Sequence, residues 1–188
     1  MARWEPDSRG RLVEAALALY GEHGYENTTV AEIAERAGLT ERTFFRHFTD
    51  KREVLFFGAA MLQELMVEAV AGAPDTATPI EAVTLGLEAA GAMFEERRHF
   101  SRRRQAIITA SAELRERELI KLASLSAALA DTLRRRGVPD PAAGLTGEVA
   151  IAVFRIGFER WVDASNHDDL STIMRRSLEE LKAVTAGR

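Results

Sequence analysis

The fold of this chain is decided by residues 28–52, TTVAEIAERAGLTERTFFRHFTDKR. Thr29 is followed three residues later by Glu32, the Ser/Thr-x-x-Glu spacing of a capping box, which predicts the start of a short helix. Gly38 follows the last apolar residue of that helix, where a left-handed residue commonly ends one. Thr40 is a second candidate N-cap. The stretch therefore predicts two short helices joined by a tight turn, which is the helix-turn-helix pattern.

The same stretch is basic in a protein that is acidic as a whole. From Arg36 to Arg52 the chain holds five basic and two acidic residues, a local charge of +3, whereas the 188-residue chain carries −4. Attraction to phosphate supplies most non-specific affinity for DNA, so a local basic patch matters more than the total charge. The second helix of a helix-turn-helix enters the major groove. The charge pattern therefore indicates a DNA-binding segment.

The segment AEIAERAGLTERTFFRHFTDKREVL resembles the DNA-binding signature of the tetracycline-repressor (TetR) family of transcriptional regulators. The match is specific over roughly residues 10–56, about a quarter of the chain. The resemblance implies that some side chains face bases and that others, at the positions of Thr29, His47 and Lys51, contact the DNA backbone. The base-facing positions are Glu41, Arg42, Thr43 and Arg46. With Thr40 and Phe45 on the same helix, these make up the candidate DNA-binding residues.

One of these residues departs from the family. Members often have Tyr where this chain has Phe45, and the Tyr hydroxyl often reaches a phosphate; Phe45 cannot make that bond. The chemistry of the neighbouring positions is favourable, because Arg42 or Arg46 could bond guanine in bidentate fashion and Glu41 could accept from the N4 amino group of cytosine.

Composition narrows the class of protein further. Hydrophobic residues make up 46% and charged residues 29% of the chain, which is typical of a globular protein. Cysteine is absent, so disulfides, thiolate metal sites and catalysis by cysteine are excluded. The N-terminus lacks the apolar core of a signal peptide, and we find no run of about 18 apolar residues. We therefore expect a cytoplasmic protein with no membrane partner.

The rest of the chain predicts helices and no strand. Helical spacing of apolar residues recurs to the C-terminus, which predicts an all-α protein of about nine helices. We assign residues 1–50 to a helix-turn-helix DNA-binding domain and residues 51–188 to a helical effector-binding and dimerisation domain. A long helix over residues 51–72, apolar on more than one side, would be the mechanical link between them.

Apolar and aromatic residues from several of these helices are candidates for an effector pocket, because cavities between bundle helices are a common kind of binding site. The alternative for each residue is solid core. The family resemblance implies that some of them line such a pocket. The candidates are Met61, Leu65, Leu87, Met93, Phe94, Phe100, Ile107, Leu122, Leu125, Phe154 and Phe158.

The last two predicted helices carry wide apolar faces that few other elements remain to cover. Two helices from each of two copies would bury these faces as a four-helix interface, and the family resemblance implies the same homodimer. The candidate interface residues are Phe158, Trp161, Ile173, Met174, Leu178 and Leu181.

Catalysis has no positive support in the sequence. There is no Gly-rich phosphate loop and no G-x-S-x-G motif. One helical pair, Glu95 and His99, has a spacing that metal ligands can use, but one such pair is weak evidence, and a surface or cap role is the favoured interpretation. We therefore expect no catalytic residue, no metal and no cofactor.

The sequence leads to one interpretation and one alternative. We expect a dimeric regulator, a repressor, that binds a palindromic operator and is released by a lipophilic or amphipathic ligand. An anionic end of that ligand could meet Arg102, Arg103 or Arg104, although for this basic cluster we favour a solvated face whose arginines pair with Glu95, Glu96 or acidic groups of the first domain. The alternative, motivated by Phe45 and the acidic total, is a helical ligand- or partner-binding protein with little or no operator binding.

Overall fold

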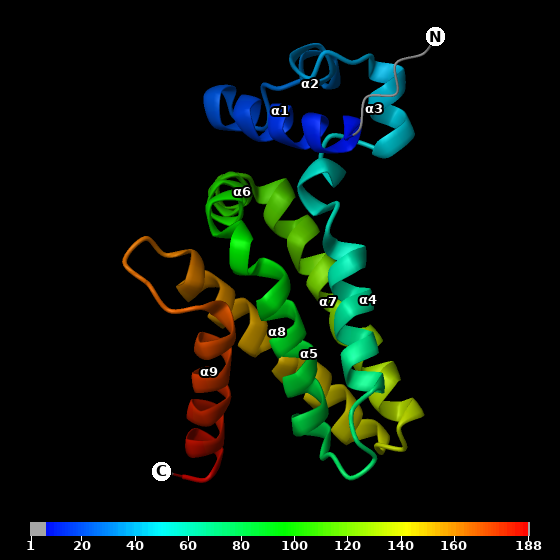
Figure 1. Cartoon of the computed structure of the whole chain (residues 1–188), viewed down its shortest axis with the longest axis vertical. Coiled ribbons are helices and arrows are strands. Elements are labelled where there is room, and N and C mark those ends of the chain that lie inside the picture. The colour runs from blue at the N-terminus through cyan, green and yellow to red at the C-terminus, as the bar shows by residue number, and fades with distance from the viewer. Residues whose placement is uncertain (1–6, 188) are drawn as a thin grey trace. The chain divides into compact units, whose positions relative to one another are not determined.

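A computed structural model describes residues 7–187, which form nine α-helices and two short 3-10 helices (Figure 1). In chain order they are α1 Ser8–His23, α2 Val30–Arg36, α3 Glu41–His47, η1 Glu53–Phe56, α4 Ala59–Ala71, α5 Pro79–Phe94, η2 Glu95–Arg97, α6 Arg98–Ala110, α7 Ala112–Arg135, α8 Asp140–Val162 and α9 Leu170–Thr185. Residues 7–187 contain no strand, and the predicted all-α fold is confirmed.

The chain folds as two compact units. The N-terminal unit runs to Gly58 and also includes residues 103–118, and the C-terminal unit comprises 59–102 and the chain from Leu119 onward. The expected division into residues 1–50 and 51–188 is therefore wrong in two respects. The first unit is longer, and it takes in the second half of α6 and the start of α7.

Local hydrogen bonds and a glycine set the ends of α2 and α3, the two helices of the helix-turn-helix. The Thr29 hydroxyl accepts the backbone N–H of Glu32 at 3.2 Å, and the Glu32 carboxylate accepts that of Thr29 at 2.7 Å. Gly38 has φ +66°, which ends α2, and the Thr40 hydroxyl accepts the N–H of Thr43 at 3.2 Å to begin α3. The helix-turn-helix expected from spacing is confirmed.

The expected continuous helix over residues 51–72 is wrong. It is a 3-10 turn, η1, followed by a break and then α4, which begins at Ala59. Asp50 accepts the N–H groups of Arg52 and Glu53 at 2.8 and 3.2 Å, which holds a tight turn. In a continuous α-helix the carbonyl of Leu55 would accept from Ala59. Instead it accepts Nε–H of Arg104 at 2.7 Å.

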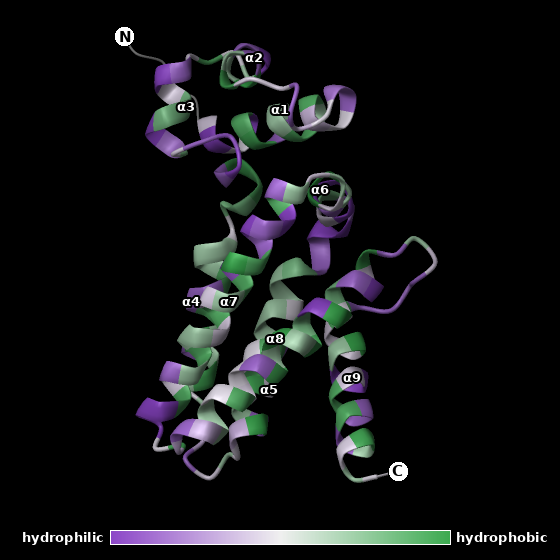
Figure 2. Cartoon of the chain, turned by 180° about the vertical axis from the view of Figure 1, so that it is seen from behind, coloured by the Kyte–Doolittle hydropathy of each residue, from purple (hydrophilic) through white to green (hydrophobic). Residues whose placement is uncertain are grey.

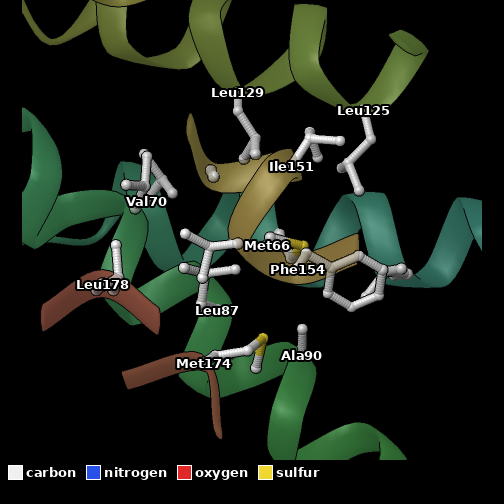
Figure 3. Close-up of a cluster of buried hydrophobic side chains, with 14 of the residues drawn as sticks. Met66, Val70, Leu87, Ala90, Leu125, Leu129, Ile151, Phe154, Met174 and Leu178 are labelled. Carbon is white, nitrogen blue, oxygen red and sulfur yellow. The ribbon is translucent and has the colours of Figure 1, made fainter. Parts of the chain in front are cut away.

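The core of the C-terminal unit forms where α4, α5, α7, α8 and α9 meet (Figure 3). Met66, Leu87 and Leu129 are fully buried there, and each such side chain contributes about 1.5–3 kcal/mol of transfer free energy. The capping box of Thr78 and Glu81 begins α5, as the sequence predicts. Hydrophobic and hydrophilic residues alternate along α9 (Figure 2). Its buried residues, among them Ile173 and Leu178, belong to this core.

Two helical stretches are apolar and long enough, by length and composition alone, to cross a membrane: residues 53–71 and 140–162. This differs from the expectation drawn from the sequence. Both stretches supply buried residues to the protein core, such as Leu55 from the first and Phe154 from the second.

Candidate functional site

Helix α3 is anchored on one side and open on the other. Phe44 and Phe48 are buried and lie with ring centroids 5.4 Å apart. The opposite side presents Glu41, Arg42 and Arg46 to solvent. The buried aromatic pair fixes the orientation of the helix, so these exposed side chains are held on a rigid element.

The exposed arginines of α3 have no carboxylate partner. Arg42 and Arg46 form no hydrogen bond or ion pair with any other residue in the described part of the chain. Other arginines of the same unit are paired, as Arg36 is with Glu22 and Arg103 with Glu14. Two uncompensated guanidinium groups one helical turn apart suit phosphate or the O6 and N7 acceptors of guanine.

Phe45 lies on the same exposed side. Its side chain is 55% exposed, although it is a large aromatic residue. Its ring meets that of Phe44 edge to face, with centroids 5.4 Å apart. The inner edge of the Phe45 ring is therefore supported by the core while the outer part remains in solvent.

Three threonines of the motif, Thr29, Thr40 and Thr43, are exposed or half-buried, and Thr29 and Thr40 are the N-caps of α2 and α3. Thr40 and Thr43 have their hydroxyl oxygens 3.1 Å apart, and Thr29 donates to the carboxylate of Glu32 at 2.8 Å. Because a hydroxyl can both donate and accept, capping leaves each of them able to bond a further group.

One ring nitrogen of His47 is already hydrogen-bonded within the protein. Its Nε2 lies 2.9 Å from the hydroxyl of Ser8, which joins α3 to the start of α1. Burial, together with the charges of Arg46 and Arg9, lowers the pKa of His47 below its ordinary value. The imidazole is therefore mostly neutral at pH 7 and adds little positive charge to this surface.

Lys51 is bonded inside the protein rather than presented to DNA. Its ammonium group donates to the carbonyls of Tyr25 and Thr28, both at 2.9 Å, and reaches that of Glu26 at 3.4 Å. It also lies 4.3 Å from the centroid of the Tyr25 ring. An ammonium group has three donors, and all three are used. The structure thus contradicts a DNA-backbone role for Lys51 and shows it closing the loop between α1 and α2.

The basic cluster of α6 is also structural. In the C-terminal unit, Arg98 donates to the carbonyl of Trp161 at 2.8 Å, and Arg102 donates to those of Val162 and Asp163 at 2.8 and 2.7 Å. Carbonyls at the end of a helix have no intrahelical donor. The two arginines therefore cap the C-terminus of α8.

The remaining two arginines of that cluster bond within the N-terminal unit. Arg104 donates to the carbonyl of Leu55 and to the carboxylate of Glu118, and it lies over the ring of Phe56. Arg103 pairs with a carboxylate of α1. The favoured interpretation, that these arginines bond within the protein, fits the ion pairs of Arg103 with Glu14 and of Arg104 with Glu118. The alternative role of Arg102, Arg103 or Arg104 in binding an anionic ligand is not supported, because each already has partners.

The candidate pocket residues divide by burial. Ile107 belongs to the N-terminal unit, and the others belong to the C-terminal unit. Met61 is 52% exposed, so it does not line an enclosed cavity. The buried members are Leu87, Ile107, Leu125, Phe154 and Phe158, and the half-buried members are Leu65, Met93, Phe94, Phe100 and Leu122.

An aromatic cluster surrounds one of the half-buried residues. The ring of Phe94, at the end of α5, lies 5.3 Å from that of Phe158 and 6.1 Å from those of Phe154 and Trp161. The last three are buried, whereas Phe94 keeps part of its ring accessible. This is the part of the C-terminal unit where an apolar ligand would meet most aromatic surface.

The proposed dimer-interface residues are mostly core residues of a single chain. Trp161 is only 2% exposed. The other buried members are Phe158, Ile173, Met174 and Leu178, and Leu181 alone is half-buried. Side chains covered by their own chain cannot cover a partner, so this assignment is wrong for all but Leu181.

Small residues of α8 serve packing inside the chain. A Cβ atom at Gly157 would lie 2.8 Å from the Met174 side chain, and one at Gly147 would lie 2.8 Å from the carbonyl of Ser126. These glycines allow α8 to approach α9 and α7 closely.

A second apolar stripe on α8 was missed. Leu145 is 68% and Ile156 is 39% exposed; Val149 is half-buried and Ala152 exposed between them. Their spacing of three and four residues places all four on one side of the helix. The sequence contains this periodicity, but the interface assignment was based on the larger aromatic residues of the other face.

Two family models match the chain. Residues 12–56 match that of the bacterial regulatory proteins of the tetR family, and residues 77–186, more than half of the chain, match that of the MftR C-terminal domain. The first match covers the helix-turn-helix, and the second begins just before α5 and extends through α9.

Among curated proteins, the HTH-type transcriptional regulator TcmR of Streptomyces glaucescens is 38% identical over 77 residues, which cover 41% of this chain and 34% of TcmR. The HTH-type transcriptional repressor KstR2 of Mycobacterium tuberculosis is 40% identical over 47 residues, 25% of this chain and 24% of KstR2. The chain thus matches only about a quarter to a third of the length of these relatives.

A solved structure matches over nearly the whole length. The transcriptional regulator FadR from Bacillus subtilis, in complex with stearoyl-CoA, superposes with a TM-score of 0.64 at 20% identity, covering 92% of this chain and 96% of that one. At this identity the similarity establishes the fold.

Proposed function

Because this chain belongs to the TetR family of bacterial regulatory proteins, we propose that it is a repressor that binds a palindromic operator as a homodimer. An apolar ligand in the C-terminal unit releases it. The family is one of DNA-binding regulators rather than enzymes, and a regulator of bacterial genes acts in the cytoplasm.

The exposed guanidinium pair of α3 carries the proposal. Arg42 and Arg46 are exposed, unpaired within the described residues and held on a helix whose other face is buried. Other arginines of this unit are paired with carboxylates, as Arg36 is with Glu22 and Arg103 with Glu14. Nucleic acid offers the missing acceptors, and a bidentate contact to guanine supplies sequence discrimination.

The dimer, in our proposal, forms through the exposed stripe of α8 rather than through the buried residues first expected. Leu145, Ala152 and Ile156 are exposed and Val149 between them is half-buried, which leaves an apolar strip along one side of α8. In a twofold dimer the same strip serves both copies, which suits a self-complementary apolar surface.

The exposed end of α9 lies on the same side as this strip. Arg160, one turn beyond Ile156, pairs with Glu180 of α9 at 3.5 Å. Val184, which is 73% exposed, lies one turn beyond Glu180. The pair therefore brings the exposed sides of both helices together, and we include Leu181 and Val184 in the proposed interface.

The effector, in our proposal, binds beside the aromatic cluster around Phe94. Half-buried Leu65, Met93 and Leu122 supply further apolar surface in the same unit. No group of three or more His, Cys, Asp or Glu side chains able to hold a metal occurs among residues 7–187. An apolar ligand gains about 25 cal/mol per Å² of apolar surface buried, which favours a lipophilic molecule.

Helix α6 is the proposed route of release. Its first residues, including Arg98 and Arg102, belong to the C-terminal unit, and residues 103–110 belong to the N-terminal unit. A displacement of its start would be carried along the same helix to Arg104, which holds the Leu55 carbonyl at the break before α4. Affinity for DNA falls only if the ligand prefers the displaced state.

DNA selection tests the proposal. Purified protein is equilibrated with random-sequence 30-base-pair duplexes, and retained duplexes are sequenced. We expect an inverted repeat whose half-sites contain guanine, and we expect Arg42→Ala to relax choice at one position of each half-site. The control is Arg36→Ala, which removes an arginine paired with Glu22. Retention of no duplex by a folded protein would support the alternative, a ligand-binding protein without an operator.

A further inference from the structure

We propose that Phe45 is a specificity-determining residue that contacts the C5-methyl group of a thymine in each operator half-site. This rests on the proposed function and names a feature of the operator that the arginines do not determine. The observation behind it is a large apolar side chain, 55% exposed, on the side of α3 that carries the unpaired arginines.

Exposure of this ring is maintained by the structure. The residue before it, Phe44, is fully buried, and its ring meets that of Phe45 edge to face at 5.4 Å. Phe44 in turn packs against Phe48. The Phe45 ring cannot enter a core position already filled by Phe44, so it remains directed toward solvent on a rigid support.

Its surroundings are charged. Glu41 and Arg42 lie four and three residues earlier on the helix, and Arg46 follows directly, so charged groups surround the ring. Aromatic and arginine side chains also occur together at protein–protein interfaces, so the choice of DNA rests on the proposed function of this helix. DNA offers phosphates and base edges for the charges and, in the major groove, one apolar group, the thymine methyl.

The phenyl ring of Phe45 has no hydroxyl group, so it cannot form a hydrogen bond to phosphate. A phenyl ring contacts a thymine methyl through dispersion and exclusion of water, and these act without a donor. Burial of one methyl group corresponds to about a fourfold change in affinity, and two half-sites give about fifteenfold.

Deoxyuridine provides the test, because it differs from thymidine only by that methyl group. A duplex selected by the wild-type protein is resynthesised with each thymine replaced by deoxyuridine, one symmetric pair at a time. We expect one pair to weaken binding about fifteenfold. Phe45→Ala should weaken the thymine duplex by a similar factor and bind the thymine and uracil forms equally.

Phe45→Leu is the matched control, because it keeps an apolar contact and should retain part of the preference for thymine over uracil. Both substitutions are at an exposed position, and equal melting temperatures will verify that the variants fold. Equal weakening of thymine and uracil duplexes by Phe45→Ala would overturn the inference, since it indicates contact with sugar or backbone. An unchanged affinity, or a selected operator without thymine, would also overturn it. A wild-type protein that retains no duplex would instead overturn the proposed function itself.

Discussion

The ammonium group of Lys51 donates a hydrogen bond to the carbonyl of Thr28 at 2.9 Å. Thr28 directly precedes the N-cap of α2, and Lys51 lies in the turn that leads into η1. The bond therefore connects the beginning and the end of the helix-turn-helix. A residue that the family resemblance places on the DNA backbone instead holds the DNA-binding unit together.

This arrangement predicts that Lys51→Met lowers stability rather than acting mainly on DNA affinity. Loss of the bonds to Tyr25, Glu26 and Thr28 and of the cation–π contact should cost about 1–3 kcal/mol of unfolding free energy. Urea unfolding measures it. Arg46→Met, which removes an unpaired charge, is the control and should leave stability within about 0.5 kcal/mol. Equal stabilities of the two variants would show that the internal bonds of Lys51 contribute nothing.

The assignment of base contacts to Arg42 and Arg46 predicts a loss of both operator affinity and sequence discrimination when either is removed. Arg42→Ala and Arg46→Ala should each cost about 1–3 kcal/mol in operator affinity and relax choice at one base pair. Competition binding with single-base variants of the selected operator measures both effects. If both substitutions left affinity within twofold, α3 would not be the helix that reads the operator.

The exposed strip of α8 predicts the assembly. Leu145→Asp with Ile156→Asp should give a folded monomer, because charge placed in an apolar interface must be desolvated. Light scattering at micromolar concentration gives the mass. Leu85→Asp, at a residue 38% exposed on α5, is the matched control and should remain dimeric. A monomeric wild-type protein would contradict the interface.

The buried residues of the earlier interface assignment predict the opposite kind of failure. Ile173→Asp places a carboxylate in the core of a single chain, where Ile173 is 4% exposed. It should cost several kcal/mol and unfold the C-terminal unit rather than separate folded subunits. A folded monomer from this variant, seen by circular dichroism and light scattering, would restore the first assignment.

The depressed pKa of His47 predicts a dependence of stability on pH. Its pKa is lower in the folded state, so the unfolded chain takes up a proton first as the pH falls. The contribution of His47 to the free energy of unfolding is fully present above its unfolded-state pKa of about 6.5. It is lost as the pH falls through the pKa of the folded state. His47→Gln should remove this part of the profile. An NMR titration of His47 that gave a raised pKa would reverse the sign and contradict the account.

Sequence reasoning succeeded where the determinants are local. The capping boxes of Thr29 with Glu32 and of Thr78 with Glu81 span three residues each and appear as expected. It failed where the deciding partner is distant. Leu55 lies in the 3-10 helix η1 rather than in a continuous α-helix, and its carbonyl accepts from Arg104, 49 residues away.

The sequence also did not distinguish the core face of a helix from its exposed face. Helix α8 has apolar residues on two sides. Side-chain size alone favours Trp161 over Leu145 as an interface residue. The structure shows that Trp161 is buried within the chain and Leu145 is exposed. Only the packing of α8 against α5 and α9 distinguishes a core face from a face left for a partner.

The central claim is that unpaired arginines on α3 bind an operator. Its most direct test is a titration of the selected duplex with wild-type protein and with the double variant Arg42→Ala, Arg46→Ala, at about 50 and 200 mM salt. The account predicts saturable wild-type binding that weakens steeply with salt, and for the double variant a loss of at least tenfold with a smaller salt dependence and an unchanged melting temperature. Wild-type and variant titrations that coincide at both salt concentrations would contradict it.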